Sequence, residues 1–178
     1  YDCDEETWES GLVTVDGEAT FEDLQDAIDA ADNDSALAIC PGTWEGNFVI
    51  DKPLALIGQG DASGVVLDGG GTGSVVEVTA SNVRLTDLTV TNGVGKEDNG
   101  LLRGGGISVR PGSGLVLTSV AVLENSADIG GGVYVANATI ELTGDWIVTG
   151  NTATDGAGLY VEGGPLRMSG GELGGNVA

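Results

Sequence analysis

The amino-acid sequence predicts an all-β fold, a parallel β-helix (solenoid) of about five coils with an amino-terminal α-helical cap. Two markers recur at a nearly constant spacing within the 178 residues. The glycine-rich strand starts "GGGISV", "GGGVYV" and "GAGLYV" lie 26 residues apart, at Gly104, Gly130 and Gly156. Asparagines followed by an alanine two places later lie 26 and 25 residues apart, at Asn125, Asn151 and Asn176. Two independent markers in step indicate a repeat.

Each repeat unit contains three short apolar runs in the same order, such as "GGGVYV", "IELT" and "WIVTGN". The unit lacks helical periodicity in its interior and is too long for a leucine-rich repeat, which excludes both kinds of solenoid. Three strands joined by glycine turns in one period are typical of a coil of a parallel β-helix. Each strand would then pair with its equivalents in the coils above and below.

The elements are expected in a fixed order along the chain. An acidic amino-terminal segment occupies residues 1–19, and the β-helix domain occupies residues 20–178. The domain begins with a helical cap over 20–33, where Phe21, Leu24, Ile28 and Ala31 share one face in "TFEDLQDAIDAADND". Thr20 and Asp23 form a candidate capping pair. Such a helix would cover the apolar end of the stack.

The coils follow over residues 36–178 and contain one irregularity. Asn92 precedes Asn125 by 33 residues, and the seven extra residues fall in "GVGKEDNGLLR". We expect a loop that protrudes from an otherwise regular coil, a place where solenoids often carry function. The sequence stops at "GGNVA", where a further glycine-rich start would be expected. This predicts either a truncated solenoid or an end covered by another chain, by self-association for example.

Charge and cysteine content limit the partners and the compartment. The chain has 28 acidic and 6 basic residues, a net charge of −22 and no histidine. Nucleic acid and anionic membranes would be repelled, and no apolar stretch is long enough for membrane insertion. Cys3 and Cys40 could form a disulfide that ties the acidic segment to the first strand, which favours an oxidising compartment. The alternative is two unrelated thiols.

Two stretches resemble known β-helix proteins. The run "FEDLQDAIDAADNDSALAICPGTWEGNFVIDKPLALIGQG" resembles the start of right-handed parallel β-helices of the pectin-lyase-like superfamily. The later "GGGxxV" starts, with an apolar residue three places before each repeat asparagine, resemble the GGA-type and FxxN repeats of polymorphic outer-membrane and related bacterial surface proteins. The resemblance implies a right-handed coil and an extracellular or bacterial cell-surface location.

The same superfamily contains lyases, esterases, epimerases and proteins without catalysis, so the resemblance is weak for activity. Catalytic residues of these enzymes are missing here. The chain has no histidine, and it lacks the Gln and the "QDT" aspartate of the similar pectin methylesterases. No cluster of acidic residues surrounds an arginine in the sequence. We therefore predict no catalytic residue, although carboxylates from successive coils can meet in space.

The first strand of each coil suggests a candidate ligand surface. Alternation along these strands places Glu77, Ser108, Tyr134 and Tyr160 outward, in one column with about 4.8 Å between neighbours. Tyr134 and Tyr160 would be stacked on an exposed flat face, on which a sugar ring could lie. The alternative is a cross-strand aromatic pair that only stiffens the sheet.

The repeat asparagines Asn125, Asn151 and Asn176 predict a structural ladder, with each amide bonded to its neighbours and to the backbone inside a turn. Metal motifs fail on inspection: "DGGGTGSVV" has Val75 in place of the aspartate of a calcium-binding nonapeptide, and "DNDSAL" lacks the glycine and glutamate of an EF-hand. We predict no cofactor and no metal site. Weak calcium binding at the acidic end is left open.

These features favour a structural or adhesive module of a bacterial surface protein, binding a glycan or a surface protein along a stacked face. One alternative is a polysaccharide-active enzyme such as a lyase, esterase or epimerase. Such an enzyme should have a groove where two or more carboxylates and an arginine converge. The other alternative is a module that self-assembles end to end through its carboxyl-terminal coil.

Overall fold

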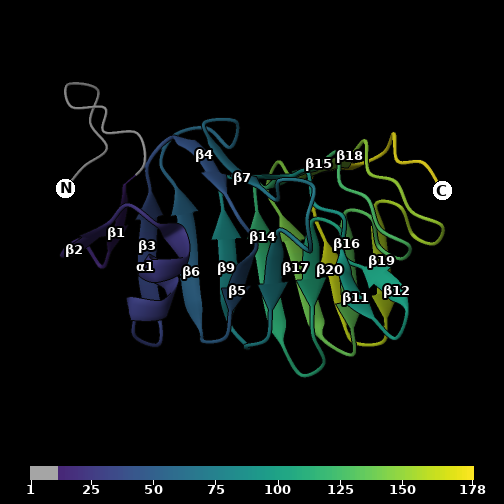
Figure 1. Cartoon of the computed structure of the whole chain (residues 1–178), viewed down its shortest axis with the longest axis horizontal. Helices are drawn as coiled ribbons and strands as arrows, with labels where there is room; N and C mark the ends of the chain where they lie inside the picture. The colour runs from purple at the N-terminus through teal and green to yellow at the C-terminus, as the bar shows by residue number, and fades with distance from the viewer. Residues whose placement is uncertain (1–11) are drawn as a thin grey trace.

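The computed structural model describes residues 12–178 as an all-β structure with one short helix (Figure 1). Most strands belong to three parallel sheets, named sheets I, II and III. Sheet I contains β2 (Ala19–Phe21), β1 (Val13–Val15), β3 (Ser35–Ile39), β6 (Leu54–Gly58), β9 (Val83–Thr86), β14 (Gly114–Thr118), β17 (Thr139–Thr143) and β20 (Leu166–Met168), in this order. Only β1 and β2 run antiparallel to their neighbours in this sheet.

Sheets II and III are parallel throughout. Sheet II contains β4 (Gly42–Glu45), β7 (Val65–Asp68), β10 (Thr89–Thr91), β15 (Ala121–Leu123), β18 (Ile147–Thr149) and β21 (Glu172–Leu173). Sheet III contains β5 (Phe48–Ile50), β8 (Val76–Val78), β13 (Ile107–Val109), β16 (Val133–Ala136) and β19 (Leu159–Glu162). From β3 onward the chain visits sheets I, II and III in turn, which is consistent with the parallel β-helix that the repeat predicts.

The core lies between the sheets and is built from columns of inward side chains. In sheet I, Leu37, Leu56, Leu85, Leu117 and Leu142 are paired in register on successive strands, and all five are buried. Strand alternation turns every second residue inward, so the 26-residue spacing puts the same kind of side chain at the same place in each coil. Burial of each leucine contributes about 1.5–3 kcal/mol.

Trp146 also belongs to the core. Spacing alone could not place this side chain, but it is 3% exposed and packs with the buried cluster. Its indole Nε1 donates to the Ser169 carbonyl oxygen at 3.1 Å, which satisfies the one polar atom of the ring.

The amino-terminal elements differ in detail from the expectation. Helix α1 covers Leu24–Ala30, shorter than the predicted 20–33, because Asp23 is the N-cap and accepts from the Asp26 amide at 2.9 Å. The helix packs beside β1, β2 and β5. The free edge of β3, however, is paired with β1. Part of the acidic segment predicted at 1–19 is thus a strand of sheet I, while residues 1–11 lie outside the described part.

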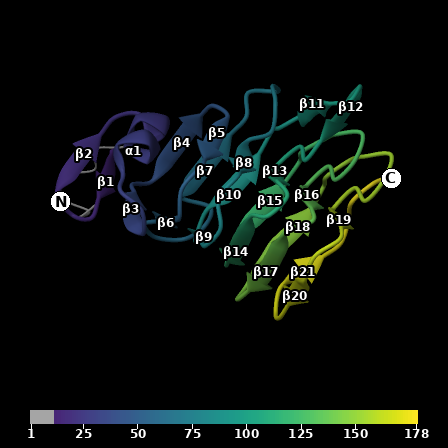
Figure 2. The ribbon, with the colours of Figure 1, turned by 90° about the horizontal axis from the view of Figure 1, so that it is seen from below.

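The irregular coil contains a hairpin. Strands β11 (Lys96–Asp98) and β12 (Leu101–Arg103) pair antiparallel where the sequence predicted a protruding loop. Figure 2 shows this hairpin on the side of β13 and β16, away from β14 and β17. The insertion therefore projects from sheet III and is in a position to cover that face.

Candidate functional site

The predicted ligand column lies in register on sheet III. Glu77 of β8, Ser108 of β13, Tyr134 of β16 and Tyr160 of β19 are successive ladder partners. The rings of Tyr134 and Tyr160 stack, with centroids 5.8 Å apart and an interplanar angle of 13°. The expectation of an exposed flat face is wrong, however. Glu77 is 7% exposed, Ser108 0% and Tyr134 1%, because the insertion lies over this part of the sheet.

The insertion is held as a hairpin by its turn. Asn99 and Gly100 adopt positive φ angles of 54° and 81°, the conformation of an Asn-Gly type I′ turn. The Gly100 amide donates to a Glu97 carboxylate oxygen at 2.8 Å. On the other side of β12, the Leu102 amide donates to Asp128 at 2.7 Å. The hairpin is therefore bonded to the neighbouring coil as well as to itself.

Glu77 joins the hairpin to the sheet. Lys96 of β11 donates to its Oε2 at 2.5 Å, and the Arg110 Nε donates to its Oε1 at 2.7 Å. Burial raises the pKa of Glu77, but the hydrogen bonds and charges of Lys96 and Arg110 outweigh burial and leave the pKa below its usual value. Glu77 is therefore an ionised anchor between two cations. A carboxyl group in this state is a poor proton donor near neutral pH.

Arg103 joins the end of β12 to the tyrosine stack. Its NH1 donates to the Tyr134 hydroxyl at 2.7 Å, and the guanidinium lies 5.4 Å from the centre of the same ring. The Tyr134 hydroxyl donates to Glu162 at 2.8 Å. Burial and the bond to Glu162 raise the pKa of Tyr134, although Arg103 lowers it. The phenol is therefore protonated at neutral pH, and it links one cation to one carboxylate.

Asp98 completes the cluster between the two arginines. Its Oδ2 lies 3.6 Å from Arg110 NH1 and 3.8 Å from Arg103 NH1. Three carboxylates thus meet three cations here, and each carboxylate faces at least one cation. Ser108 Oγ and Arg103 Nε are buried in this area without a hydrogen-bond partner among the described residues. We call the set Glu77, Lys96, Asp98, Arg103, Arg110, Tyr134 and Glu162 the hairpin clamp.

The clamp was only half visible in the sequence. Glu77 and Tyr134 were predicted to share an outward column, and the insertion was predicted to protrude. Lys96, Asp98, Arg103 and Arg110 were not identified as partners of that column. The only signal was the charged composition of "GKEDNGLLR", because a sequence does not show where a loop folds back.

A shallow pocket opens beside the clamp. Its volume is about 230 Å³, and its lining includes Asn47, Phe48, Ser74, Glu77 and Lys96. Asn47 is committed to the backbone, since its amide donates to the carbonyl oxygens of Thr72 and Ser74 at 2.7 Å and 2.9 Å. Ser74 Oγ likewise donates to the Arg103 carbonyl at 3.2 Å. This pocket is therefore walled by side chains that already have partners.

The repeat asparagines form a hydrogen-bonded ladder. Asn151 Oδ1 accepts from both the backbone amide and the side-chain amide of Asn125, each at 3.0 Å. Asn176 Oδ1 accepts from the same two groups of Asn151, at 3.0 Å and 2.9 Å. Asn92 is not a member, because the strand register places Gly93 opposite Asn125. The amide of Gly93 donates to Asn125 Oδ1 at 2.9 Å.

Three further expectations concern metals, membranes and the cysteines. Over residues 12–178 no group of three or more Cys, Asp or Glu side chains is arranged to hold a metal ion. Helix α1, the one helix of that region, is too short to cross a membrane. Cys40 is buried, but Cys3 lies outside the described residues, so the Cys3–Cys40 disulfide stays a prediction.

Comparison with known proteins gives one local similarity. No family profile matches the chain, and no solved structure matches it. The chain is 35% identical over 97 residues to the "Probable ABC transporter binding protein NosD" of Pseudomonas aeruginosa, in a match that covers 44% of this chain. The chain spans only 22% of that protein's length. Together with the parallel sheets, this similarity is compatible with the predicted resemblance to β-helix proteins.

Proposed function

We propose that this chain is a non-catalytic binding module of an exported bacterial surface protein. In this proposal the three parallel sheets are a rigid scaffold, and the side of sheet III that bears the hairpin contacts a glycan or another surface protein. The observation that carries the proposal is the state of the hairpin clamp. Charged groups do converge there, but they are largely buried or paired with each other.

The clamp is unsuited to acid–base catalysis. An enzyme of this architecture needs a carboxyl group or a base that reaches substrate with a pKa near the working pH. Glu77 has a lowered pKa and two cationic partners, and the pKa of Tyr134 is raised. Neither group is free to exchange a proton with a substrate near neutral pH. This supports a binding or structural role over a lyase, esterase or epimerase.

The exposed surface around the clamp supplies the binding groups. Tyr160 is partly exposed and Glu162 is exposed at the edge of sheet III, and Leu101 and Leu102 of β12 are 40% and 37% exposed. An aromatic ring beside a carboxylate and a small apolar patch can pack on a sugar ring and accept its hydroxyls. The binding-protein designation of the Pseudomonas aeruginosa relative agrees with this role.

A polysaccharide panel tests the proposal. Purified protein is incubated with neutral and acidic polysaccharides, with and without calcium, and both binding and release of shorter products are measured. We expect binding to at least one glycan without turnover. Tyr160→Ala should weaken binding about tenfold or more, as expected when an aromatic stacking partner is lost, while Leu166→Ala on sheet I should not. Turnover of any polysaccharide would overturn the non-catalytic role, and equal binding by both variants would remove the ligand from sheet III.

A further inference from the structure

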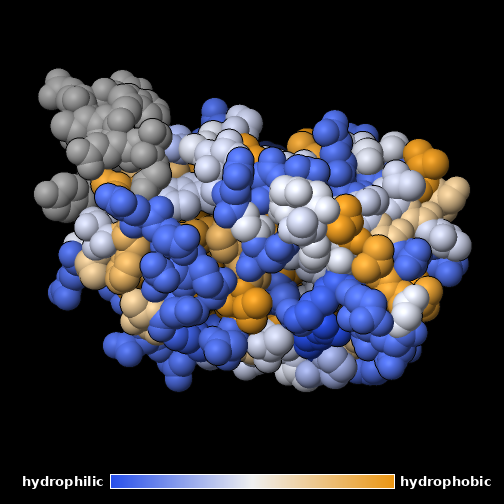
Figure 3. All heavy atoms as spheres, in the orientation of Figure 1, coloured by the Kyte–Doolittle hydropathy of each residue, from blue (hydrophilic) through white to orange (hydrophobic). Residues whose placement is uncertain are grey.

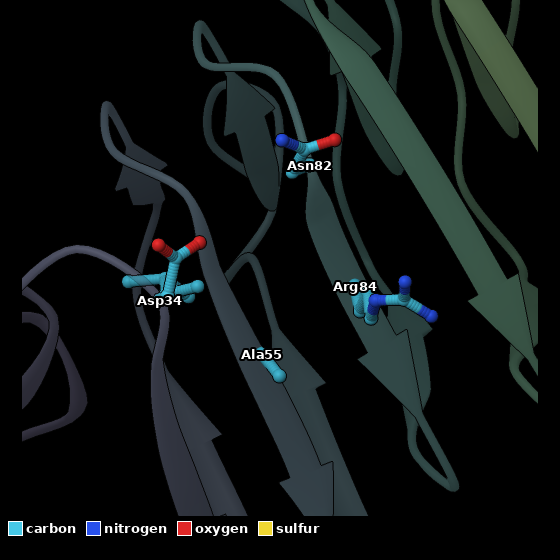
Figure 4. A pocket seen from close by; sticks show the side chains of 5 residues that line it. Asp34, Ala55, Asn82 and Arg84 are labelled. Carbon is cyan, nitrogen blue, oxygen red and sulfur yellow. The ribbon is translucent and has the colours of Figure 1, made fainter.

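The outer face of sheet I holds a second polar pocket, remote from the hairpin. It has a volume of about 380 Å³ and is lined by Asp34, Leu54, Ala55, Asn82 and Arg84. Figure 4 shows Asp34 and Arg84 on either side of Ala55, with Asn82 farther along the same face. The volume lies within the range of small-ligand sites, about 300–1,000 Å³.

The pocket exists because the outward row of sheet I contains small residues at this point. Strand pairing aligns Ala36, Ala55 and Arg84 on β3, β6 and β9. Alanine fills little of the space above the sheet, so the longer side chains around it form a rim. Asp34 and Asn82 each precede a strand with a positive φ, 65° and 58°, a conformation in which Asp and Asn are favoured. The backbone thereby holds both polar groups at the rim.

The three polar side chains are not used by the fold. Within residues 12–178, no hydrogen bond or ion pair involves the carboxylate of Asp34, the amide of Asn82 or the guanidinium of Arg84. Most other cations in that region are engaged: Arg103 and Arg110 in the clamp, and Lys52 with two backbone carbonyls. The pocket therefore contains an available cation and an available anion that do not neutralise each other.

We propose that this pocket binds a small zwitterion of short-peptide size. Arg84 would take a carboxylate through paired N–H donors, Asp34 a cationic amine, and Asn82 a peptide group between them. A polyanion is disfavoured by the net charge of −22 and by Asp34. A simple cation would leave Arg84 without a partner. A ligand with both charges is the class that matches all three groups.

The spacing sets the length of the ligand. Strand β6 separates β3 from β9, so the backbones that hold Asp34 and Arg84 are two strand spacings apart, about 9.6 Å. A single α-amino acid has its charges too close together to span this gap. A tripeptide extends to about 10 Å, so triglycine is a suitable probe.

The test is a titration followed by amide chemical shifts in ¹⁵N-labelled protein. Triglycine should shift the amides of residues around Asp34, Ala55 and Arg84, whereas N-acetyl-triglycine and triglycine amide should bind at least about tenfold more weakly, because each lacks one charge. Arg84→Gln and Asp34→Asn should weaken triglycine binding to the same degree. Both residues are exposed, so these variants are expected to fold, and circular dichroism checks that they do.

Matched controls separate a site from bulk charge. Arg167→Gln removes a cation from the same outward row of sheet I, three strands from Arg84. Asp87→Asn changes an aspartate with a similar positive φ of 51°. Both controls should bind triglycine like the parent. No shifts at millimolar triglycine, equal binding of the blocked peptides, or equal losses in Arg84→Gln and Arg167→Gln would each overturn the proposal. None of these outcomes bears on the glycan test, which concerns sheet III.

Discussion

Gly131 and Gly132 stand where a β-carbon would overlap the next coil. A β-carbon on Gly131 would lie 2.3 Å from the Thr152 carbonyl oxygen, and one on Gly132 would lie 2.5 Å from that of Gly158. Both obstacles are backbone atoms, which cannot move aside as a side chain can. The "GGG" starts therefore serve close approach between coils, and their recurrence follows from the recurrence of that contact.

Gly131→Ala should destabilise the fold by about 1–3 kcal/mol, the usual cost of an overpacked interior. The measurement is chemical denaturation followed by circular dichroism. Gly114→Ala is the matched control, since a β-carbon added at Gly114 would have its nearest neighbouring atom 3.6 Å away. This control should stay within about 0.5 kcal/mol of the parent. A similar loss in both variants would show that chain flexibility, and not the contact between coils, explains the glycine.

The β11–β12 hairpin is the element that most changes sheet III. It is short, has only its own two strands as a sheet, and would be marginal alone. Its order comes from Lys96 and Arg103, which reach Glu77 and Tyr134 on the sheet beneath. A surface that the repeat alone would leave open is thereby closed over three of its four outward residues.

Glu77→Gln should loosen this hairpin. The substitution removes the charge that Lys96 and Arg110 share, and a cation left without its partner near a buried site is destabilising. We expect hydrogen exchange of the β11 and β12 amides to rise about tenfold or more, while amides of β14 and β17 stay protected. Glu45→Gln, at an exposed position on β4, is the control and should leave the hairpin unchanged. Unaltered exchange in Glu77→Gln would mean that the turn and Asp128 alone hold the hairpin.

The whole molecule combines a strongly acidic surface with a few cations placed mostly against specific carboxylates. Figure 3 shows hydrophilic side chains over most of the face that it displays, with small hydrophobic areas between them. Asp16, like Glu77, has a lowered pKa, here because it accepts from the Ala36 amide and the Ser35 hydroxyl. Acid therefore has two opposite effects: it relieves general repulsion, and it removes these two specific carboxylate contacts.

The contribution of Glu77 should disappear at low pH. Its pKa in the folded protein is below its usual value, so the stabilisation is complete above about pH 4.3 and is lost as the pH falls through the folded value. Thermal melting of the parent and of Glu77→Gln from about pH 7 to about pH 3 isolates this contribution, because general repulsion changes almost equally in both. The gap in melting temperature should be constant down to about pH 5 and then shrink. A gap that stays constant or widens would contradict the anchoring role.

The sequence by itself determined the repeat, and the repeat determines which residues are ladder partners. Spacing alone aligned Glu77, Ser108, Tyr134 and Tyr160 on sheet III, because strands of equal spacing stack in register. It could not show that the first three are buried, nor that Gly93, and not Asn92, faces Asn125. Those outcomes depend on how an insertion folds back and where the extra residues leave the strand. Only the tertiary structure decided them, since they are contacts between segments for which the sequence contains no period.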